Sequence, residues 1–260
     1  MTEEERYTVF DENFGLKGKT AIITGSGSGI GIEIAKMYAR KGANVVSVDK
    51  SIAPDLQEYV EKQGVKYLAI LGDLTDEEFV NDTIVNTVVR IFGKIDILVN
   101  CAGVGVLETL DNSTREIWNL TMAVNLTAGV NLSLAVGKRM KETGGGSIIN
   151  IASQAGVIAI EGHLSYGTAK AGLIQATKQF ALEWGQFGIR SNCISPEVIL
   201  TPMGKMNWDN PKGEEAKKMI PSRRFGYPQE VAALAVYLGS DAASLINGTN
   251  IMIDGGNTIW

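Results

Sequence analysis

The sequence predicts a single α/β domain in which a parallel sheet of seven strands is covered by helices on both faces. Seven short runs rich in β-branched residues alternate with longer helical patterns along the chain. These runs are continuously apolar, as expected of strands that are buried on both faces. Glycine is in excess, at 30 of 260 residues with only 6 prolines and no fixed period, which fits the tight turns of a doubly wound α/β sandwich.

Each element follows from its local pattern. The predicted strands cover residues 20–24, 44–48, 66–71, 95–99, 147–151, 189–194 and 250–253. The segments between them predict helices, most of them 10 to 25 residues long, that begin near Gly29, Pro54, Asp76, Thr114, Leu164 and Pro228. This strand and helix alternation is that of repeated βαβ units.

No linker or repeat divides the chain, so residues 18–260 are predicted to form one catalytic domain. Residues 1–17 precede the first strand and are interpreted as an N-terminal arm, either packed on the body or frayed. The segment 203–226, with several methionines and Trp208, is predicted to be a mobile flap over the site, with Gly204 and Gly213 as hinges.

Charge and composition limit the partners. Lys and Arg number 24 against 29 Asp and Glu, a net charge of −5, so neither a nucleic acid nor an anionic membrane is expected. The apolar stretches fall short of the roughly 18 residues of a membrane span, and the acidic start is unlike a secretory signal. Cys101 and Cys193 give no disulfide framework, and one histidine gives no metal cluster. We therefore expect a cytoplasmic protein with a small-molecule ligand and no metal.

A glycine-rich turn joins the first predicted strand to the first predicted helix. The segment 24–31 reads T-G-S-G-S-G-I-G. Glycines let the backbone approach a diphosphate, and the helix N-terminus offers free N–H groups to its charge. The predicted cofactor-binding residues of this turn are Gly25, Ser28, Gly29, Ile30 and Gly31. A P-loop lysine is absent from the turn, which argues against a nucleoside triphosphatase.

Asp49 ends the second predicted strand, 18 residues after Gly31. A carboxylate at this place can accept hydrogen bonds from both hydroxyls of an adenosine ribose and would repel a 2′-phosphate. This favours NAD over NADP. Lys50 follows directly and is able in principle to pair with a 2′-phosphate, which leaves NADP as the alternative.

Further cofactor contacts are expected where the third and fourth strands end, because ligands of open parallel sheets bind at the carboxyl edge. Asp73 and Leu74 end the third strand, and Asn100, Ala102 and Gly103 follow the fourth. Cys101 has no basic partner in the local sequence, so it is interpreted as a small buried residue and not as a nucleophile.

Ser153 follows the fifth strand, and Tyr166 and Lys170 stand four residues apart at the start of the next predicted helix. Residues with this spacing share one helix face. The ammonium group of Lys170 and the positive nicotinamide of an oxidised cofactor favour a phenolate, which lets a tyrosine exchange protons at neutral pH. Ser153 is then expected to donate to the substrate oxygen.

Taken together, T-G-x-x-x-G-I-G, N-C-A-G, Ser153, Y-x-x-x-K and the final D-G-G resemble the short-chain dehydrogenase/reductase family over residues 18–257. The resemblance implies a Rossmann-type fold and a catalytic tetrad, in which Asn125 joins the three residues above and holds a water that links Lys170 to solvent. It also implies cofactor contacts from Pro196, Ile199 and Thr201. Two positions depart from the family pattern, since Cys101 replaces an asparagine and Glu197 replaces a glycine.

Within the family, the chain is most similar to NAD-dependent polyol dehydrogenases and xylulose reductases. The predicted substrate contacts are Ser153, Gln154, His163, Tyr166, Glu197 and Trp208, although an ordinary loop role for His163 and flap packing for Trp208 stay open. The resemblance implies a homotetramer built through helices 114–141 and 164–186. Reduction of another ketone, of 3-oxoacyl or steroid type, is the alternative activity, and a protein that binds a nucleotide without turnover is the alternative from another class.

Overall fold

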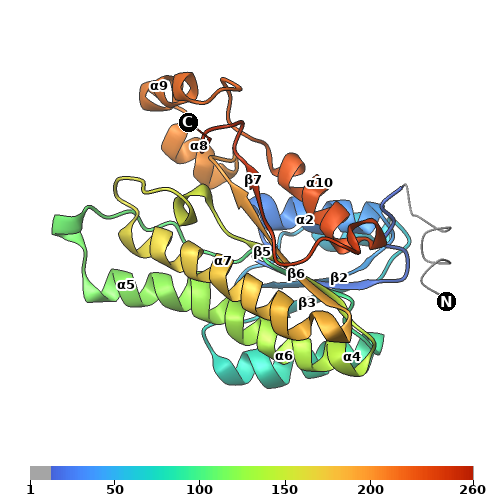
Figure 1. Ribbon diagram of the computed structural model, residues 1–260. Helices are drawn as coiled ribbons and strands as arrows, with labels where there is room; N and C mark the ends of the chain where they lie inside the picture. The colour runs from blue at the N-terminus through green and yellow to red at the C-terminus, as the bar shows by residue number, and fades with distance from the viewer. Residues whose placement is uncertain (1–12, 260) are drawn as a thin grey trace.

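The computed structural model describes residues 13–259 (Figure 1). The predicted arm therefore lies largely outside the described residues, and only its end is seen. Leu16 is buried in the core and Phe14 packs edge-on against Tyr237 at 5.5 Å. The last residues of the segment thus pack on the body of the protein.

Seven parallel strands form one sheet in the order β3-β2-β1-β4-β5-β6-β7. The strands are β1 (Thr20–Thr24), β2 (Asn44–Asp49), β3 (Tyr67–Leu71), β4 (Ile97–Asn100), β5 (Gly146–Ile151), β6 (Ile189–Pro196) and β7 (Asn250–Ile253). The chain first adds strands on one side of β1 and then returns to add the rest on the other side. This confirms the predicted doubly wound sheet and places its topological switch between β1 and β4.

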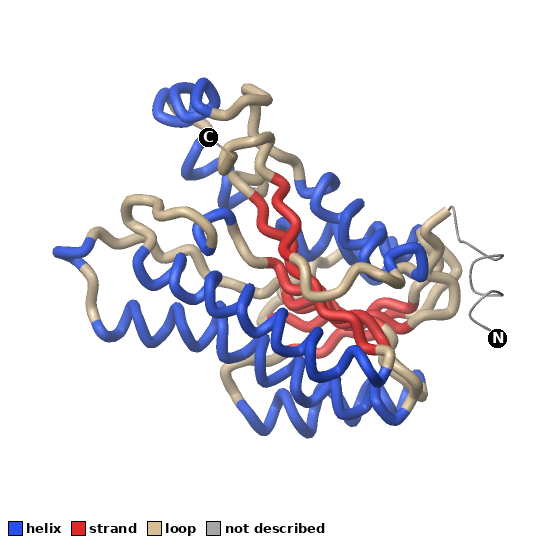
Figure 2. Tube along the Cα trace, in the orientation of Figure 1, coloured by secondary structure: helices blue, strands red, loops and turns tan. Residues whose placement is uncertain are grey.

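Helices cover both faces of the sheet (Figures 1 and 2). The main helices are α2 (Gly29–Arg40), α3 (Leu56–Glu61), α4 (Val85–Phe92), α5 (Arg115–Met122), α6 (Ala128–Glu142), α7 (Leu164–Trp184) and α10 (Pro228–Gly239). Two further helices, α8 (Pro202–Trp208) and α9 (Pro211–Met219), stand apart from the sheet at its carboxyl end.

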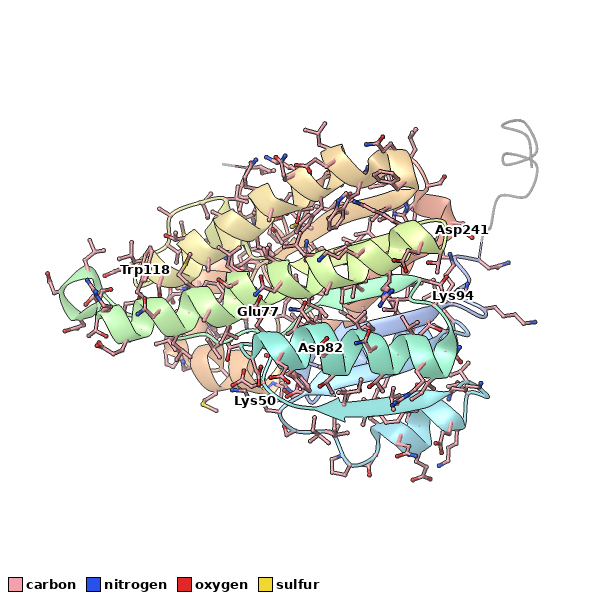
Figure 3. The ribbon with its side chains drawn as sticks, turned by 90° about the horizontal axis from the view of Figure 1, so that it is seen from below. Lys50, Glu77, Asp82, Lys94, Trp118 and Asp241 are labelled. Atoms are coloured by element: carbon pink, nitrogen blue, oxygen red, sulfur yellow. The ribbon has the colours of Figure 1, made fainter. Side chains whose placement is uncertain are left out.

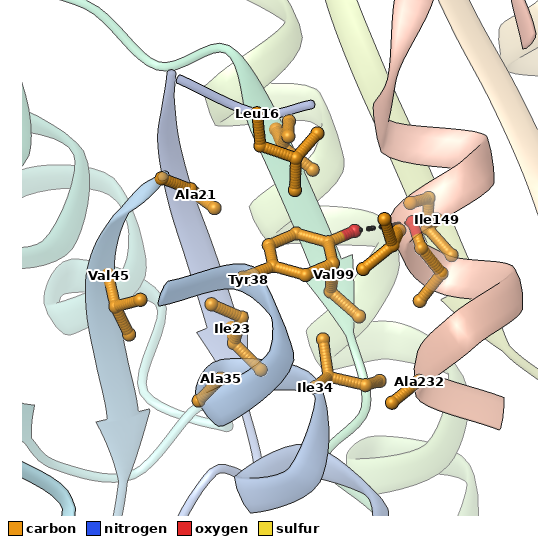
Figure 4. Close-up of a cluster of buried hydrophobic side chains, with 14 of the residues drawn as sticks. Leu16, Ala21, Ile23, Ile34, Ala35, Tyr38, Val45, Val99, Ile149 and Ala232 are labelled. Atoms are coloured by element: carbon orange, nitrogen blue, oxygen red, sulfur yellow. Dashed lines mark hydrogen bonds between the residues drawn. The ribbon is translucent and has the colours of Figure 1, made fainter. Parts of the chain in front are cut away.

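Alternate residues of each strand pack into two separate hydrophobic cores, one on each face of the sheet. Ala21 and Ile23 of β1 face α2 and α10, whereas Ile22 faces the layer of α4, α6 and α7. Tyr38 is fully buried in the first core, and its hydroxyl donates a 2.7 Å hydrogen bond to the main-chain oxygen of Ala235 (Figure 4). The strand-wide apolar runs are thus explained by burial on both faces.

The helix that runs through Arg115–Glu142 is 28 residues long and, by length and composition, apolar enough to cross a membrane. Its length agrees with the predicted helix 114–141, whereas the expectation that the apolar stretches fall short of a membrane span does not hold for this helix. Leu132, Val136 and Met140 on this helix are fully buried against the sheet, which is the placement of a core helix in a globular domain.

Three consecutive glycines, Gly144 to Gly146, lead into β5, whose first residue is Gly146. Gly144 and Gly145 have φ values of +92° and +115°, and a Cβ on Gly145 would lie 2.4 Å from the main-chain oxygen of Gly188. The glycines at 144 and 145 are therefore explained by left-handed backbone and, at Gly145, by close chain approach.

Candidate functional site

The glycine-rich turn after β1 lies against the loop after β4. A Cβ on Gly25 would lie 2.7 Å from Cα of Ala102, and one on Gly31 would lie 2.2 Å from the main-chain oxygen of Gly25. Gly25 and Gly29 have positive φ values of +68° and +58°. The turn thus folds over itself at the topological switch, and only glycine fits these places.

The turn presents the N-terminus of α2. Ser28 is the N-cap residue, is extended and exposed, and its side chain makes no cap hydrogen bond within the described chain. Ile30 packs against the core below the turn. The first N–H groups of α2 therefore have no side-chain acceptor, and they fit the diphosphate of a dinucleotide.

Asp49 ends β2 beside this turn, and Asp73 follows the neighbouring strand β3, which ends at Leu71. Asp49 accepts hydrogen bonds from the main-chain N of Gly27 at 2.9 Å and of Ser51 at 3.2 Å. Asp73 forms an ion pair with Lys50 at 2.7 Å, and this pairing, together with Thr75, lowers the pKa of Asp73 to about 2. The Lys50 ammonium is thus paired with the Asp73 carboxylate. Figure 3 shows Lys50 at the opposite end of the sheet from Lys94.

The loop after β4 is held to β1 through one hydroxyl. Thr24 Oγ1 accepts from the main-chain N of Cys101 and of Ala102, at 3.0 and 3.1 Å. Asn100 points the other way and donates to Asn150 Oδ1 at 2.8 Å within the sheet. The Asn100 side chain thus links β4 to β5.

A pocket at this edge of the sheet contains several predicted site residues and is lined in part by Thr24, Leu74, Asn100, Ala102 and Asn125.

Neither cysteine has the character of a nucleophile. Burial raises the pKa of Cys101 to about 12 and that of Cys193 to about 11. Both thiols are free, and a thiol that stays protonated is unreactive. Cys101, interpreted from the sequence as a small buried residue and not as a nucleophile, packs against the core but is only partly buried.

Ser153 reaches the site on a short turn that packs closely on α7. Ser153 is the N-cap residue of the turn Gln154–Gly156, and its Oγ accepts from the main-chain N of Ala155 at 3.2 Å. A Cβ on Gly167 would lie 2.8 Å from the oxygen of Ala155, and one on Gly156 would lie 2.8 Å from the backbone at Lys170. The glycine after Tyr166 is therefore required so that the serine segment can lie on the helix.

Lys170 is buried, with 5% of its surface exposed, and its Nζ donates to the oxygen of Ile151 at 2.8 Å. Its ammonium lies 5.7 Å from the ring centre of Tyr166. A Cβ on Gly103 would lie 3.7 Å from this Nζ and 2.8 Å from Asn125 Oδ1. Four predicted site residues thus lie close together where β4, β5 and α7 meet, namely Lys170, Tyr166, Gly103 and Asn125.

Asn125 lies in a π-helical turn, Ala123–Thr127, between α5 and α6. Its side chain exchanges two hydrogen bonds of 2.8 Å with the main chain of Val104. The π-helical turn thus places a buried Asn125 whose side chain, among the described residues, hydrogen-bonds only to the loop after β4. Such an insertion in a helix is frequent at functional sites.

His163 stands at the N-cap of α7, with its ring edge-on to Tyr166 at 5.9 Å. Its Nδ1 contacts the main-chain oxygen of Glu161 at 2.7 Å. A carbonyl oxygen only accepts, so Nδ1 is the donor, and in the neutral ring Nε2 is then left to accept from a ligand.

Gln154 is held by the chain end, a partner that sequence reasoning missed. Asn257 donates to Gln154 Oε1 at 3.0 Å, although 103 residues separate the two. Asp254 fixes this tail by accepting from Gly256 and from Thr258. No local signal relates these positions, since only the pairing of β7 with β6 brings the tail to the site.

The flap 203–226 contains α8 and α9 and is closed at its base. Ile199 and Gly226 form an isolated bridge, and Leu200 donates to the oxygen of Gly226 at 2.9 Å. Thr201 caps α8, and its methyl carbon would lie 3.3 Å from a Cβ on Gly29, which places the start of the flap on the glycine turn. Pro196, the last residue of β6, is buried.

The glycines predicted as hinges have another structural role. Gly204 and Gly213 lie in the first turns of α8 and α9, where a Cβ would lie 2.0 and 1.8 Å from a preceding main-chain oxygen. Trp208 packs edge-on against Phe225 at 5.9 Å, and Phe225 is 1% exposed. The ring therefore has a packing role inside the flap.

Glu197 follows β6 and is partly buried. Burial, and then the charge of Asp254, raise the pKa of Glu197 to about 8. Burial opposes ionisation of Asp254 too, but hydrogen bonds from Thr258 and Gly256 outweigh it and lower the pKa of Asp254. At neutral pH Glu197 is therefore mainly a neutral acid, which both donates and accepts.

A twisted parallel sheet with a glycine turn at its switch point and a Ser, Tyr and Lys set at its carboxyl edge defines a nucleotide-dependent oxidoreductase class. A family model described as enoyl-(acyl carrier protein) reductase matches residues 25–258. The chain belongs to the short-chain dehydrogenase/reductase family.

Two curated relatives are each 44% identical to this chain. One is an NAD-dependent glycerol dehydrogenase of Listeria innocua, aligned over 96% of this chain and 98% of its own. The other is a D-threitol dehydrogenase of Mycolicibacterium smegmatis, aligned over the full length of both. A solved structure from Agrobacterium tumefaciens, assigned as a 2-deoxy-D-gluconate 3-dehydrogenase with bound NADP, is 30% identical with a TM-score of 0.89, and the match covers 96% of this chain and 100% of that one.

Proposed function

We propose that this protein is an NAD-dependent dehydrogenase that oxidises a sugar alcohol or small diol to a ketose or hydroxyketone. The observation that carries the proposal is the convergence of Lys170, Asn125 and Tyr166 beside the loop after β4. Two relatives of 44% identity that are named for glycerol and D-threitol support a polyol substrate.

In this proposal Tyr166 takes the proton of the substrate hydroxyl at its phenolic oxygen. The Lys170 ammonium lies 5.7 Å from its ring centre and faces the charge that develops on the tyrosine, and Ser153 holds the substrate oxygen by a hydrogen bond. Asn125 keeps the loop after β4 in place and is assigned to holding a water that links Lys170 to solvent. When bound, the nicotinamide supplies the acceptor of the hydride.

NAD is favoured over NADP by the electrostatics at the end of β2. Asp49 points at the turn through its bond to Gly27, and its charge opposes a 2′-phosphate. Lys50, the cation that could balance that phosphate, is paired with Asp73. The NADP bound in a neighbouring structure makes this a preference to be measured.

Substrate specificity is assigned to Gln154, His163 and Glu197. Each is a polar side chain at the carboxyl edge of the sheet, and a polyol needs several hydrogen-bonding partners near the reacting carbon. Trp208 is assigned to closing the flap over them. Cofactor contacts are assigned to the glycine turn and to Asp49, Asp73, Leu74, Asn100, Ala102, Gly103, Tyr166, Lys170, Pro196, Ile199 and Thr201.

The proposed assembly is a cytoplasmic homotetramer. Leu120 and Leu134, on the long helix, and Leu182, on α7, are 49%, 41% and 78% exposed, and apolar surface of this kind marks interfaces. The unpaired thiols fit a reducing compartment. Sedimentation that shows a stable monomer would reject the tetramer.

Initial rates test the proposal directly. Glycerol, D-threitol, arabinitol, xylitol, sorbitol, galactitol and propanediol are each supplied with NAD and with NADP, and formation of the reduced cofactor is followed. The expected result is oxidation of at least one polyol with NAD. The reverse assay, with 3-oxoacyl thioesters and keto steroids, tests the alternative activity, and activity there alone would overturn the polyol assignment.

A further inference from the structure

A carboxylate from outside α7 caps the start of this helix. Glu108 lies in the loop after β4 and is 5% exposed. Its Oε1 atom accepts hydrogen bonds from the main-chain N of Ser165 at 3.2 Å and from the Ser165 hydroxyl at 2.6 Å. Ser165 is fully buried and directly precedes Tyr166.

The helix has no side-chain cap of its own within the described chain. His163 stands at the N-cap, but its side chain makes no cap hydrogen bond. The first N–H groups of a helix have no partner inside it. The buried N–H of Ser165 therefore takes its acceptor from Glu108, which is 57 residues away in the sequence.

The main chain of the same residue holds the turn that leads into α7. Glu108 N donates to the oxygen of Gly162 at 3.0 Å, and residues 108 and 163 pair as an isolated parallel bridge. Gly162 has a φ of +75°. One residue thus fixes both the entry to the helix and its first turn.

Packing alone does not explain a carboxyl group at this place. The second oxygen, Oε2, is buried and has no hydrogen-bond partner among residues 13–259. Burial of a polar atom without a partner is unfavourable, and an apolar side chain would fill the space without that penalty. Glu108 therefore stabilises this region through the hydrogen-bond acceptor that its Oε1 provides to the first turn of α7.

We propose that Glu108 is a positioning residue that sets the orientation of Tyr166 by capping α7, an inference that rests on the proposed function. Tyr166 follows the capped residue directly, so fraying of this turn displaces its hydroxyl and the ring of His163. Lys170 lies one turn further on and is anchored separately to Ile151. Loss of the cap thus disturbs the tyrosine while the lysine keeps its place.

The test compares E108A, E108Q and E108D with wild type on the polyol that wild type oxidises. At saturating NAD and polyol, E108A is expected to lower kcat about tenfold or more, since small misplacements of a reacting group are costly. The dissociation constant for NAD is expected to stay within about twofold, because the glycine turn is untouched. E108Q keeps the acceptor oxygen and is expected to remain within about threefold of wild type. The exposed Asp111 of the same loop gives a matched control, D111A, with wild-type rates.

Amide hydrogen exchange of residues 162–170 gives a readout that does not depend on activity. Faster exchange at the start of α7 in E108A, reversed in E108Q, supports the cap even if wild type oxidises no polyol, in which case only the proposed function fails. Unchanged exchange and unchanged kcat in E108A overturn the proposal, as does an E108Q variant as impaired as E108A. If E108A does not fold, E108D serves instead: its carboxylate is one methylene shorter, and wild-type kcat and exchange in this variant would reject the cap.

Discussion

Lys170 Nζ donates a 2.8 Å hydrogen bond to the main-chain oxygen of Ile151, the last residue of β5. Ser153 follows this strand two residues later. The bond therefore ties the amino group on α7 to the strand that delivers the serine, and it compensates the ammonium for burial. This hydrogen bond thus anchors the Lys170 side chain to the end of β5.

Substitution of Tyr166 by Phe is expected to lower kcat/KM for polyol oxidation about 10²-fold to 10⁴-fold, because the group that takes the proton is removed. Binding of NAD, measured by fluorescence quenching, is expected to change little. Thr168→Ala alters an exposed side chain two residues away and serves as the control. Full polyol oxidation by the phenylalanine variant would contradict the assigned role.

Substitution of Asp49 by Ala is expected to raise kcat/KM with NADP relative to NAD about tenfold to 100-fold, since hydrogen bonds to a charged group are worth about 1.5–3 kcal/mol. The measurement is cofactor titration at a fixed polyol concentration. Lys50→Ala is the matched control, and it is expected to leave the preference for NAD in place because Lys50 is paired with Asp73. An unchanged ratio in Asp49→Ala would show that this carboxylate does not select the cofactor.

Substitution of Gly25 by Ala is expected to abolish NAD binding and to lower the melting temperature, because the new Cβ would lie 2.7 Å from the backbone at Ala102. Gly64 gives a matched control. Its φ is +77°, but a Cβ there meets nothing within 4 Å, so Gly64→Ala should show only the backbone penalty of about 1–2 kcal/mol. Denaturation and cofactor titration of both variants check the difference, and equal effects would argue against the close approach.

Glu197 makes stability depend on pH. Its pKa is raised to about 8 in the folded protein from 4.5, so folding favours the protonated form. This contribution is fully present below about pH 4.5 and is lost as the pH rises to about 8. Glu197→Gln stays neutral, and its melting temperature should therefore exceed that of wild type at pH 9 but not at pH 4.5. A difference that does not vary with pH would mean that Glu197 titrates normally.

The seven strands and the glycine turn were predictable because their signals are local. An apolar run such as that of β1 reports burial on both faces, and Gly25 stands where a strand passes into a helix. The spacing of Tyr166 and Lys170 places them on one helix face in any fold that keeps the helix. Asn125 was found through family resemblance alone, because an asparagine in a helix carries no distinguishing local pattern.

The sequence by itself thus determined the sheet, the cofactor turn and the face of α7 that bears Tyr166 and Lys170. Tertiary structure decided how these parts are held: Lys50 pairs with Asp73, Glu108 caps the helix through Ser165, and Asn257 holds Gln154. The last two contacts join residues 57 and 103 positions apart. Periodicity describes which way a residue faces within its own element, whereas such contacts depend on the order of the strands and on the path of the loops between them.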